Sequence, residues 1–169
     1  PFAIAKYPVT NAQFQAFIDA PDGYNTEECW TFSAAGRAWH LEEPHPEAQS
    51  VTGDTLPRDS VCWYEAIAFC GWLGRMTGLP VSLPTEMQWQ WAAQGSDGRE
   101  YPYGTTFDPK KCNTFESEIA QTTPVDQYPE GKSPFGVFDM AGNVFEWCSN
   151  KYDNPKDSDL GGDARRSVR

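Results

Sequence analysis

The segment 136–148, Gly-Val-Phe-Asp-Met-Ala-Gly-Asn-Val-Phe-Glu-Trp-Cys, constrains the fold of this chain more than any other stretch. The pair Gly142-Asn143 is a turn signal, and the flanking residues are aliphatic or aromatic. We therefore predict strand, turn, strand, with even-numbered and odd-numbered residues on opposite faces of the second strand. The first face takes Val144, Glu146 and Cys148, and the second takes Phe145 and Trp147.

Two carboxylates of this segment, Asp139 and Glu146, lie among large apolar residues. Burying a glutamate in such surroundings is costly unless a positive charge meets it. A hard cation such as calcium would suit, because it takes carboxylate oxygens together with carbonyl oxygens where Gly142 relaxes the backbone. The alternative is that Asp139 and Asn143 only form turns and that Glu146 points to water. The spacing alone is compatible with both interpretations.

Three helices are predicted, each with a start or stop signal. Thr10 begins the first helix with Gln13 as its capping-box partner. The second covers residues 63–77. Thr85 begins the third helix. Gln88 is the capping-box partner of Thr85. The second helix is expected to end before Gly78 and the third before Gly95. The expected apolar positions are Phe14, Phe17 and Ile18, then Trp63, Ile67, Cys70, Leu73 and Met76, then Trp89, Ala92 and Ala93.

Long loops separate these helices, at 21–60 and 96–135, and a polar loop at 153–164 is expected to be exposed. A structureless loop of such length is unusual in a compact domain. We therefore expect aromatic anchors in 21–60, with a short hairpin near 29–41. Seven Trp, ten Phe, fourteen Gly and fourteen Pro are typical of a core packed by loops. Short strands with helices predict a single α+β domain over residues 1–169.

Charge and cysteine content restrict the function. A formal net charge of −11 disfavours binding of nucleic acid through its phosphates. No apolar run approaches the roughly 20 residues of a membrane span. Five cysteines without a Cys-x-x-Cys pair favour the reducing cytoplasm. Cys70 is expected to be a buried structural thiol. No nucleophile motif is present, so the chain offers no reaction centre.

Segment 136–148 resembles the Gly-Leu-Tyr-Asp-Met-x-Gly-Asn-Val-Trp-Glu-Trp signature of the formylglycine-generating enzyme (sulfatase-modifying factor) family. Other segments resemble the family in the same order along nearly the whole chain: 6–14, 61–73, 83–93, 101–104 and 122–125. The resemblance implies a C-type-lectin-like fold of the formylglycine-generating-enzyme type. Such a fold would have two to three helices, short antiparallel strands and long ordered loops.

The resemblance also implies two structural calcium sites. The ligands of one would be Asp139, Gly142, Val144 and Glu146, with carbonyl oxygens from Gly142 and Val144. The other would use Asn113 and the Thr114 carbonyl, with later ligands near Ser117 and Ile119. Ser117 stands where an aspartate would be expected, so Glu116 and Glu118 are the alternatives for that carboxylate. The competing interpretation is that Asn113 only caps a turn.

Oxidase members of the family bind copper with a cysteine pair that follows an Arg-x-x-Arg-Gly-Gly-Ser-Trp segment. Residues 166–169, Arg-Ser-Val-Arg, resemble the start of that segment. We therefore expect a domain truncated at both ends, whose C-terminal part is absent from this chain. No residue of the chain takes the catalytic cysteine role.

Three functions remain open. We predict a non-catalytic, calcium-stabilised ligand-binding or display domain, as in the variable proteins of diversity-generating retroelements. It would bind an unknown protein or small ligand through its loop-rich face, and neither nucleic acid nor membrane. The alternative is an oxidase that converts sulfatase cysteines to formylglycine with copper held by the missing tail. A related option is a sulfoxide-forming iron oxygenase whose histidine ligands come from another domain. The third is an accessory domain that holds a partner through its acidic face.

Overall fold

The computed structural model describes residues 1–162 and 164–169. In this part of the chain four α-helices, three 3-10 helices and one two-stranded antiparallel sheet follow each other. They are α1 (Asn11–Asp19), η1 (Glu27–Trp30), α2 (Ala34–Glu42), α3 (Trp63–Thr77), α4 (Glu86–Gln94), η2 (Phe115–Ser117), η3 (Pro129–Gly131), β1 (Trp147–Lys151) and β2 (Arg166–Val168). The mixture of helices with a small antiparallel sheet agrees with the predicted α+β class.

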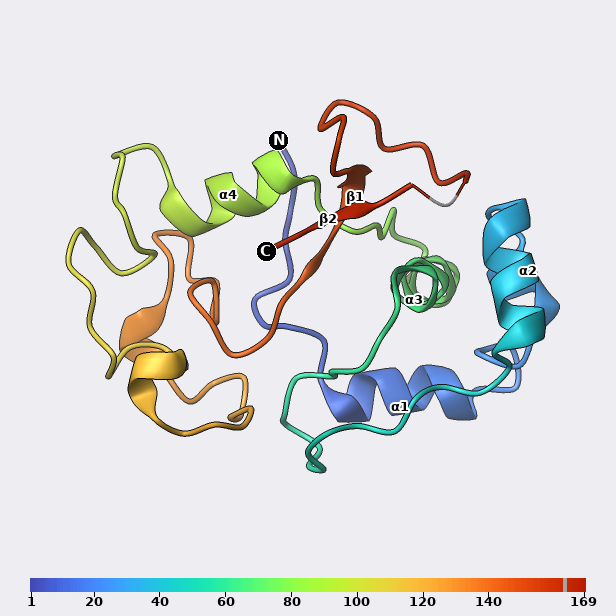
Figure 1. The fold of residues 1–169 in the computed structure, drawn as a ribbon, viewed down its shortest axis with the longest axis horizontal. Coiled ribbons are helices and arrows are strands. Elements are labelled where there is room, and N and C mark those ends of the chain that lie inside the picture. Colours follow the sequence, from blue (N-terminus) through green and yellow to red (C-terminus); the bar gives the residue numbers. More distant parts are fainter. Residues whose placement is uncertain (163) are drawn as a thin grey trace.

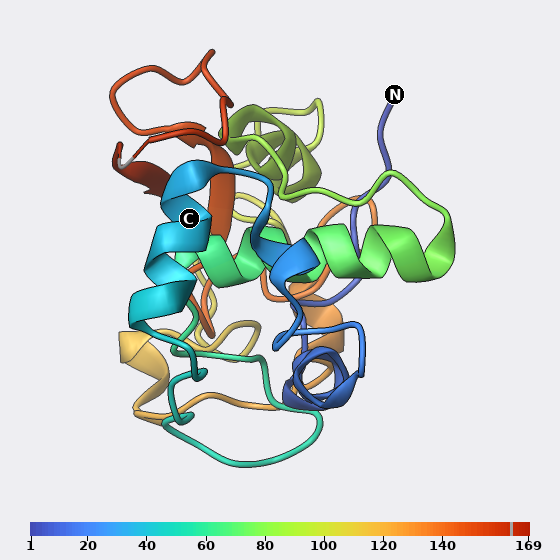
Figure 2. The same ribbon diagram turned by 90° about the vertical axis from the view of Figure 1, so that its right-hand side faces the viewer.

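Figure 1 shows α1, α2 and α3 towards one end of the molecule, and α4 with the long loop 96–135 towards the other. α3 lies near the centre, with α1 and η1 in contact with it and α2 outside η1. The turned view shows α3 crossing the molecule behind α2 (Figure 2). α4 contacts β1, whose pairing with β2 sets Trp147 opposite Val168 and Lys151 opposite Arg166. Loop 96–135 lies on the side opposite α2.

The predicted helix boundaries are confirmed. Thr10 Oγ1 accepts a hydrogen bond from the Gln13 backbone N–H, and the Gln13 side chain accepts one from the Thr10 N–H. Thr85 and Gln88 make the same reciprocal pair before α4. α3 covers the predicted residues 63–77 and ends at Gly78, which has φ +69°. These boundaries depend on local hydrogen bonds, and local sequence was therefore enough to locate them.

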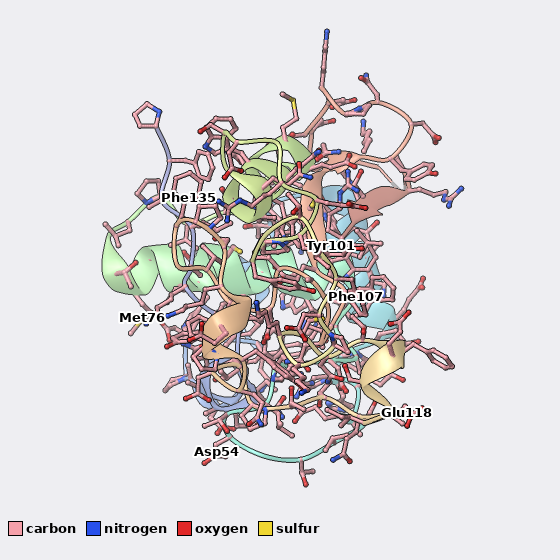
Figure 3. All side chains as sticks on the ribbon, turned by 90° about the vertical axis from the view of Figure 1, so that its left-hand side faces the viewer. Asp54, Met76, Tyr101, Phe107, Glu118 and Phe135 are labelled. Atoms are coloured by element: carbon pink, nitrogen blue, oxygen red, sulfur yellow. The ribbon has the colours of Figure 1, made fainter. Side chains whose placement is uncertain are left out.

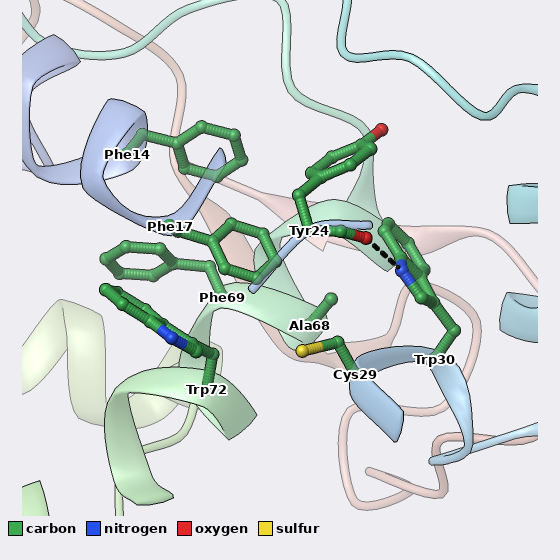
Figure 4. Packing of buried hydrophobic residues seen from close by; sticks show 8 residues of the cluster. All are labelled: Phe14, Phe17, Tyr24, Cys29, Trp30, Ala68, Phe69 and Trp72. Atoms are coloured by element: carbon green, nitrogen blue, oxygen red, sulfur yellow. Dashed lines mark hydrogen bonds between the residues drawn. The ribbon is translucent and has the colours of Figure 1, made fainter. Parts of the chain in front are cut away.

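The main core is aromatic and joins α1, α3 and the first long loop (Figure 4). Its buried members are Phe14, Phe17, Tyr24, Cys29, Trp30, Ala68, Phe69 and Trp72. The indole Nε1 of Trp30 donates a hydrogen bond of 2.8 Å to the Tyr24 carbonyl, which satisfies the polar atom of a fully buried ring. Loop 21–60 is thereby anchored by aromatic residues, as predicted. A second cluster joins α4 to the segment before β1: Ala92, Ala93, Val137 and Met140.

The predicted hairpin near 29–41 is wrong, because η1 and α2 occupy this stretch. The segment after Ser33, Ala-Ala-Gly-Arg-Ala-Trp-His-Leu-Glu, consists mostly of good helix formers. Ser33 caps it by accepting the Gly36 N–H at 3.0 Å. The described residues contain four α-helices where two to three were expected, because α2 takes the place of the predicted hairpin.

Two further expectations about side-chain placement are corrected. Met76 does not belong to the buried stripe of α3 and is 60% exposed, whereas Trp72 is buried. Met76 lies in the last turn of α3. The strand predicted around Gly142-Asn143 is confined to β1, and residues 136–146 form a series of turns. Cys148 is buried and Phe145 is exposed, but the predicted alternation of faces is wrong within β1, because Cys148, Ser149 and Asn150 are all buried.

The remaining loops agree with the sequence prediction where they are described. Residues 153–162 and 164 contain neither helix nor strand and are mainly exposed, and residue 163 lies outside the described residues. Loop 96–135 contains only η2, η3 and an isolated bridge between Tyr101 and Gly104. No helix in residues 1–162 and 164–169 has the length and apolarity needed to cross a membrane.

Candidate functional site

The turn before β1 lies against loop 96–135 at Gly142. Its φ is +148°, and a Cβ placed there would lie 2.3 Å from the Asn113 carbonyl oxygen. Only glycine permits this approach, because any side chain would overlap a backbone atom that cannot rotate away. The turn thus brings together residues of both predicted calcium sites, although these are about thirty positions apart in the sequence.

Asn143 makes most of the polar contacts between the turn and the loop. Its backbone N–H donates to the Asn113 carbonyl at 2.8 Å. Its Nδ2 donates to Asp139 Oδ2 and to the Thr123 carbonyl, both at 2.9 Å. Its Oδ1 accepts from the Thr123 N–H at 2.9 Å and from Asn113 Nδ2 at 3.1 Å. The residue has φ +73°, a conformation that asparagine tolerates better than most side chains.

The two carboxylates of the turn are desolvated. Burial, with a smaller contribution from the charge of Asp139, raises the pKa of Glu146 to about 7 against the opposing effect of the hydrogen bond from Trp89. That bond joins Trp89 Nε1 to Glu146 Oε2 at 3.1 Å. Burial likewise raises the pKa of Asp139 to about 6, against the effect of the Asn143 amide. Both groups are therefore costly to ionise without a positive neighbour.

These residues fit a hard cation. Within residues 1–162 and 164–169 neither Asp139 nor Glu146 forms a salt bridge with a basic side chain. Two carboxylates that lack a basic partner match the ligand chemistry of calcium. The Gly142 carbonyl accepts only the Val144 N–H, at 3.1 Å, and keeps a second lone pair. No cluster of three or more His, Cys, Asp or Glu side chains occurs in the described residues. Carbonyl and amide oxygens would complete the ligand set.

The second predicted site is built mainly from turn contacts. Asn113 Nδ2 donates to the Gln121 carbonyl at 2.8 Å, as well as to Asn143. The Thr114 N–H donates to Ser117 Oγ at 3.0 Å, and Ser117 Oγ donates to the Cys112 carbonyl at 2.9 Å. Ile119, Glu116 and Glu118 are exposed. The side chains of Asn113 and Ser117 therefore close the loop on itself in this structure.

The cysteines are spread over the interior of the molecule. All five are free, and Cys62 alone among them is not fully buried. Burial raises the pKa of Cys62, Cys70 and Cys148 to about 12, so these three thiols stay protonated at neutral pH. Cys70 is a buried thiol on α3, as predicted. A protonated, buried thiol is a poor nucleophile and a poor metal ligand.

Two contributors to the site were not identified from the sequence. Trp89 was expected to face inward, but its hydrogen bond to Glu146 was not foreseen. Thr123 contacts Asn143 through both backbone groups. In the sequence, Thr123 stood out only as part of the motif 122–125. That motif does not indicate a contact with Asn143, which lies twenty residues further along the chain.

Comparison with known proteins identifies the family. The model of the sulfatase-modifying factor enzyme 1-like domain matches residues 1–169. The chain is 35% identical over 161 residues to the serine/threonine-protein kinase Pkn1 of Chlamydia trachomatis, covering 89% of this chain and 23% of that protein. It is 31% identical over 189 residues to the inactive C-alpha-formylglycine-generating enzyme 2 of Mus musculus, covering 90% of this chain and 59% of that protein.

An active relative is also similar. The formylglycine-generating enzyme of Thermomonospora curvata is 30% identical over 193 residues, which cover 89% of this chain and 60% of that enzyme. The chain thus spans between about a quarter and three fifths of the length of these relatives. The match of the family model over all 169 residues is the decisive finding. The chain belongs to the sulfatase-modifying factor enzyme 1-like domain family.

Proposed function

We propose that this chain is a ligand-binding domain without catalytic chemistry of its own, built on a calcium-stabilised scaffold. The observation that carries the proposal is the exposure of Phe145. This ring is 86% exposed although its neighbour Glu146 is desolvated and Cys148 is fully buried. A rigid turn that holds an aromatic ring in solvent is suited to contact a partner, because aromatic side chains contribute large contact area at low entropic cost.

The loop-rich side of the molecule, residues 96–146, supports this proposal. Phe115 is 95% exposed and Phe135 is 58% exposed. Figure 3 shows this side, where Phe135 is exposed and the half-buried Tyr101 and Phe107 pack against each other. Binding residues are often carried on ordered loops above a rigid core. The partner would be a protein or a small ligand with apolar groups.

The lack of a catalytic role is supported by the chemistry of the thiols and by the relatives. Cys62, Cys70 and Cys148 remain protonated at neutral pH, so they supply no thiolate to a metal or a substrate. One relative is described as inactive and another as a protein kinase. Family membership therefore does not by itself specify the oxidase chemistry.

Calcium binding at the turn is the part of the proposal that can be measured directly. Asp139 and Glu146 would supply carboxylate oxygens, and Gly142 and Val144 would supply carbonyl oxygens. The ion would supply positive charge that offsets the repulsion between the carboxylates. Asn113 and Thr114 would be the corresponding residues of a second, weaker site. Calcium at the turn is expected to stabilise the folded chain, by an amount that grows with the logarithm of the calcium concentration once this exceeds Kd.

The test is a calcium titration followed by calorimetry and by thermal unfolding. At a calcium concentration of about 100 times Kd, the stabilisation expected from mass action is about 2.7 kcal/mol. Glu146→Gln should abolish most of the heat and of the rise in Tm. Glu130→Gln is the matched control, because it removes the same charge from an exposed position in η3. Unchanged Tm in calcium for the unmodified chain would remove calcium from the proposal.

The alternative function is the copper-dependent oxidation of sulfatase cysteines. The similarity to the active enzyme of Thermomonospora curvata favours it. The native full-length gene product, loaded with copper, should be incubated with a cysteine-containing sulfatase peptide and analysed by mass spectrometry. Formylglycine in the product would establish the oxidase and refute the non-catalytic proposal. Recovery of unmodified peptide, alongside conversion by the Thermomonospora enzyme, is the result we expect.

Other parts of the sequence interpretation stay predictions. They are the C-type-lectin-like fold, the relation to retroelement-diversified variable proteins, and a cytoplasmic location. The first would be tested by an experimental structure of the native gene product. The second would be tested by peptide mapping of that product, which would identify any residues beyond Arg169.

A further inference from the structure

The segment 113–123 has few buried side chains, and the hydrogen bonds of Asn113 to Gln121 and of Ser117 to Thr114 and Cys112 close it on itself. It contains a single 3-10 helix, η2, and the side chain of Phe115 projects almost entirely into solvent. Glu118 and Ala120 both have φ +57°, a backbone conformation that non-glycine residues adopt at a cost. Segments with few buried contacts and strained backbone open most easily. The order of this segment therefore depends on how its two ends are held.

Both ends are held by one residue. Asn113 shares two hydrogen bonds with Asn143, of 2.8 Å and 3.1 Å. Thr123 shares two more through its backbone N–H and carbonyl, each of 2.9 Å. The remaining hydrogen of the Asn143 amide goes to Asp139 Oδ2. A single side chain thus connects a proposed calcium ligand to both ends of segment 113–123.

We propose that Asn143 is a positioning residue that couples cation binding at the turn to the order of segment 113–123. This inference rests on the proposed calcium site at Asp139 and Glu146. A cation that fixes Asp139 also fixes the acceptor of the Asn143 amide, and through it the ends of the segment. Linkage makes the effect reciprocal, so loosening the segment weakens cation binding. Residues that orient metal ligands typically change metal affinity by 10–100-fold when mutated.

The experiment is hydrogen–deuterium exchange with and without calcium, together with calorimetric titration. In the unmodified chain, calcium should slow amide exchange throughout 113–123. Asn143→Gly preserves the positive φ but removes every side-chain bond. It should bind calcium about tenfold more weakly. Calcium should then no longer slow exchange in 113–123.

Asn11→Ala is the matched control. Asn11 is likewise an asparagine whose side chain holds a loop in place: it is buried on α1, and its Nδ2 donates to the Gly53 carbonyl at 2.9 Å. It lies on α1, away from the turn. This variant should lower Tm while leaving both the calcium affinity and the calcium-dependent exchange of 113–123 unchanged. A merely structural role for Asn143 would give the same pattern in both variants.

The outcomes separate the two proposals. If the unmodified chain shows no calcium-dependent heat, the calcium site and the coupling both fail. If it binds calcium but Asn143→Gly keeps the affinity and the protection of 113–123, only the coupling fails. Should Asn143→Gly not fold, Asn143→Asp replaces it, since it keeps the shape but exchanges the donor to Asp139 for a second carboxylate. Because this variant loses the bond to Asp139, calcium should no longer slow amide exchange in 113–123, and retained protection overturns the inference.

Discussion

His40 packs flat against the indole of Trp30, with ring centroids 4.1 Å apart and an interplanar angle of 4°. Burial lowers the pKa of this imidazole, and the charge of His45 lowers it further. The buried Nδ1 of His40 has no hydrogen-bond partner among the described residues. Protonation would place a charged N–H where the described residues offer it no acceptor, so the neutral ring is favoured.

The pH dependence of stability follows from the direction of that shift. Because the folded pKa lies below the unfolded value of about 6.5, the unfolded chain binds more protons below that pH. The His40 contribution is therefore fully present above pH 6.5 and is lost as the pH falls towards the folded pKa. His40→Phe, which keeps the stacking, should flatten the decline of Tm in this window. His45→Gln should retain most of the decline of Tm with falling pH. If His40→Phe and the unmodified chain show the same slope of Tm against pH, the attribution of this decline to His40 is contradicted.

Gly142 and Gly104 separate two effects of a positive φ. Their φ values are +148° and +142°, but a Cβ at Gly104 would meet nothing within 4 Å. Gly104→Ala should cost about 1–2 kcal/mol of unfolding free energy through backbone strain alone. Gly142→Ala should cost about 1–3 kcal/mol more, because its Cβ would overlap the Asn113 carbonyl. Urea unfolding of both variants measures the difference, and equal costs would mean that the loop moves aside freely.

At the scale of elements, Asn150 joins α4 to both strands. Its Oδ1 accepts the Glu86 N–H at 2.7 Å, at the first residue of α4. Its Nδ2 donates to Ser167 Oγ on β2 at 2.9 Å. The side chain is fully buried on β1. The helix therefore has a second cap, supplied by a residue sixty-four positions away.

Asn150→Ala should destabilise the fold more than removal of the local cap. Thr85→Ala removes one N-cap bond and should cost about 1 kcal/mol. Asn150→Ala leaves the part-buried Glu86 N–H without its acceptor and removes one of the two partners of Ser167 Oγ, so it should cost about 2–3 kcal/mol. Chemical denaturation of the two variants provides the comparison. A smaller cost for Asn150→Ala would show that solvent reaches the groups it bonds.

At the scale of the whole molecule, stability is concentrated in the aromatic core at the helical end. Phe17 is fully buried and contacts the rings of Phe14, Phe69 and Trp72. Phe17→Ala should cost about 3–5 kcal/mol. Phe115→Ala, at an exposed ring on the loop-rich side, should change stability by less than about 0.5 kcal/mol. A large loss of unfolding free energy in Phe115→Ala would mean that this ring packs in solution and is not displayed.

Helix positions could be predicted wherever the controlling interaction lies within one turn. The capping pairs at Thr10 and Thr85 join residues three positions apart, and Gly78 ends α3 by its own backbone conformation. The stretch 29–41 was mispredicted because its aromatic residues suggested a hairpin. Its helix formers and the Ser33 cap, which are equally local, were given too little weight.

The candidate site was predicted only in part. Asp139 and Glu146 were singled out because carboxylates among aromatic residues are conspicuous in any sequence. The contact of Gly142 with the Asn113 carbonyl could not be inferred, because it joins two turns separated by a loop. The same holds for the bond from Trp89 to Glu146, which depends on how α4 packs against β1.

The sequence by itself determined the start of α1, the bounds of α3 and α4, the α+β class, the family and the identity of the acidic residues, whereas α2 was missed. These depend on interactions between neighbours or on residue types in a fixed order. Only the tertiary structure decided that Asn143 holds both ends of segment 113–123, that Asn150 caps α4, and that Phe145 faces solvent. The physical reason is that hydrogen bonds and burial depend on distances in space, and chain folding sets those distances between residues that are remote in sequence.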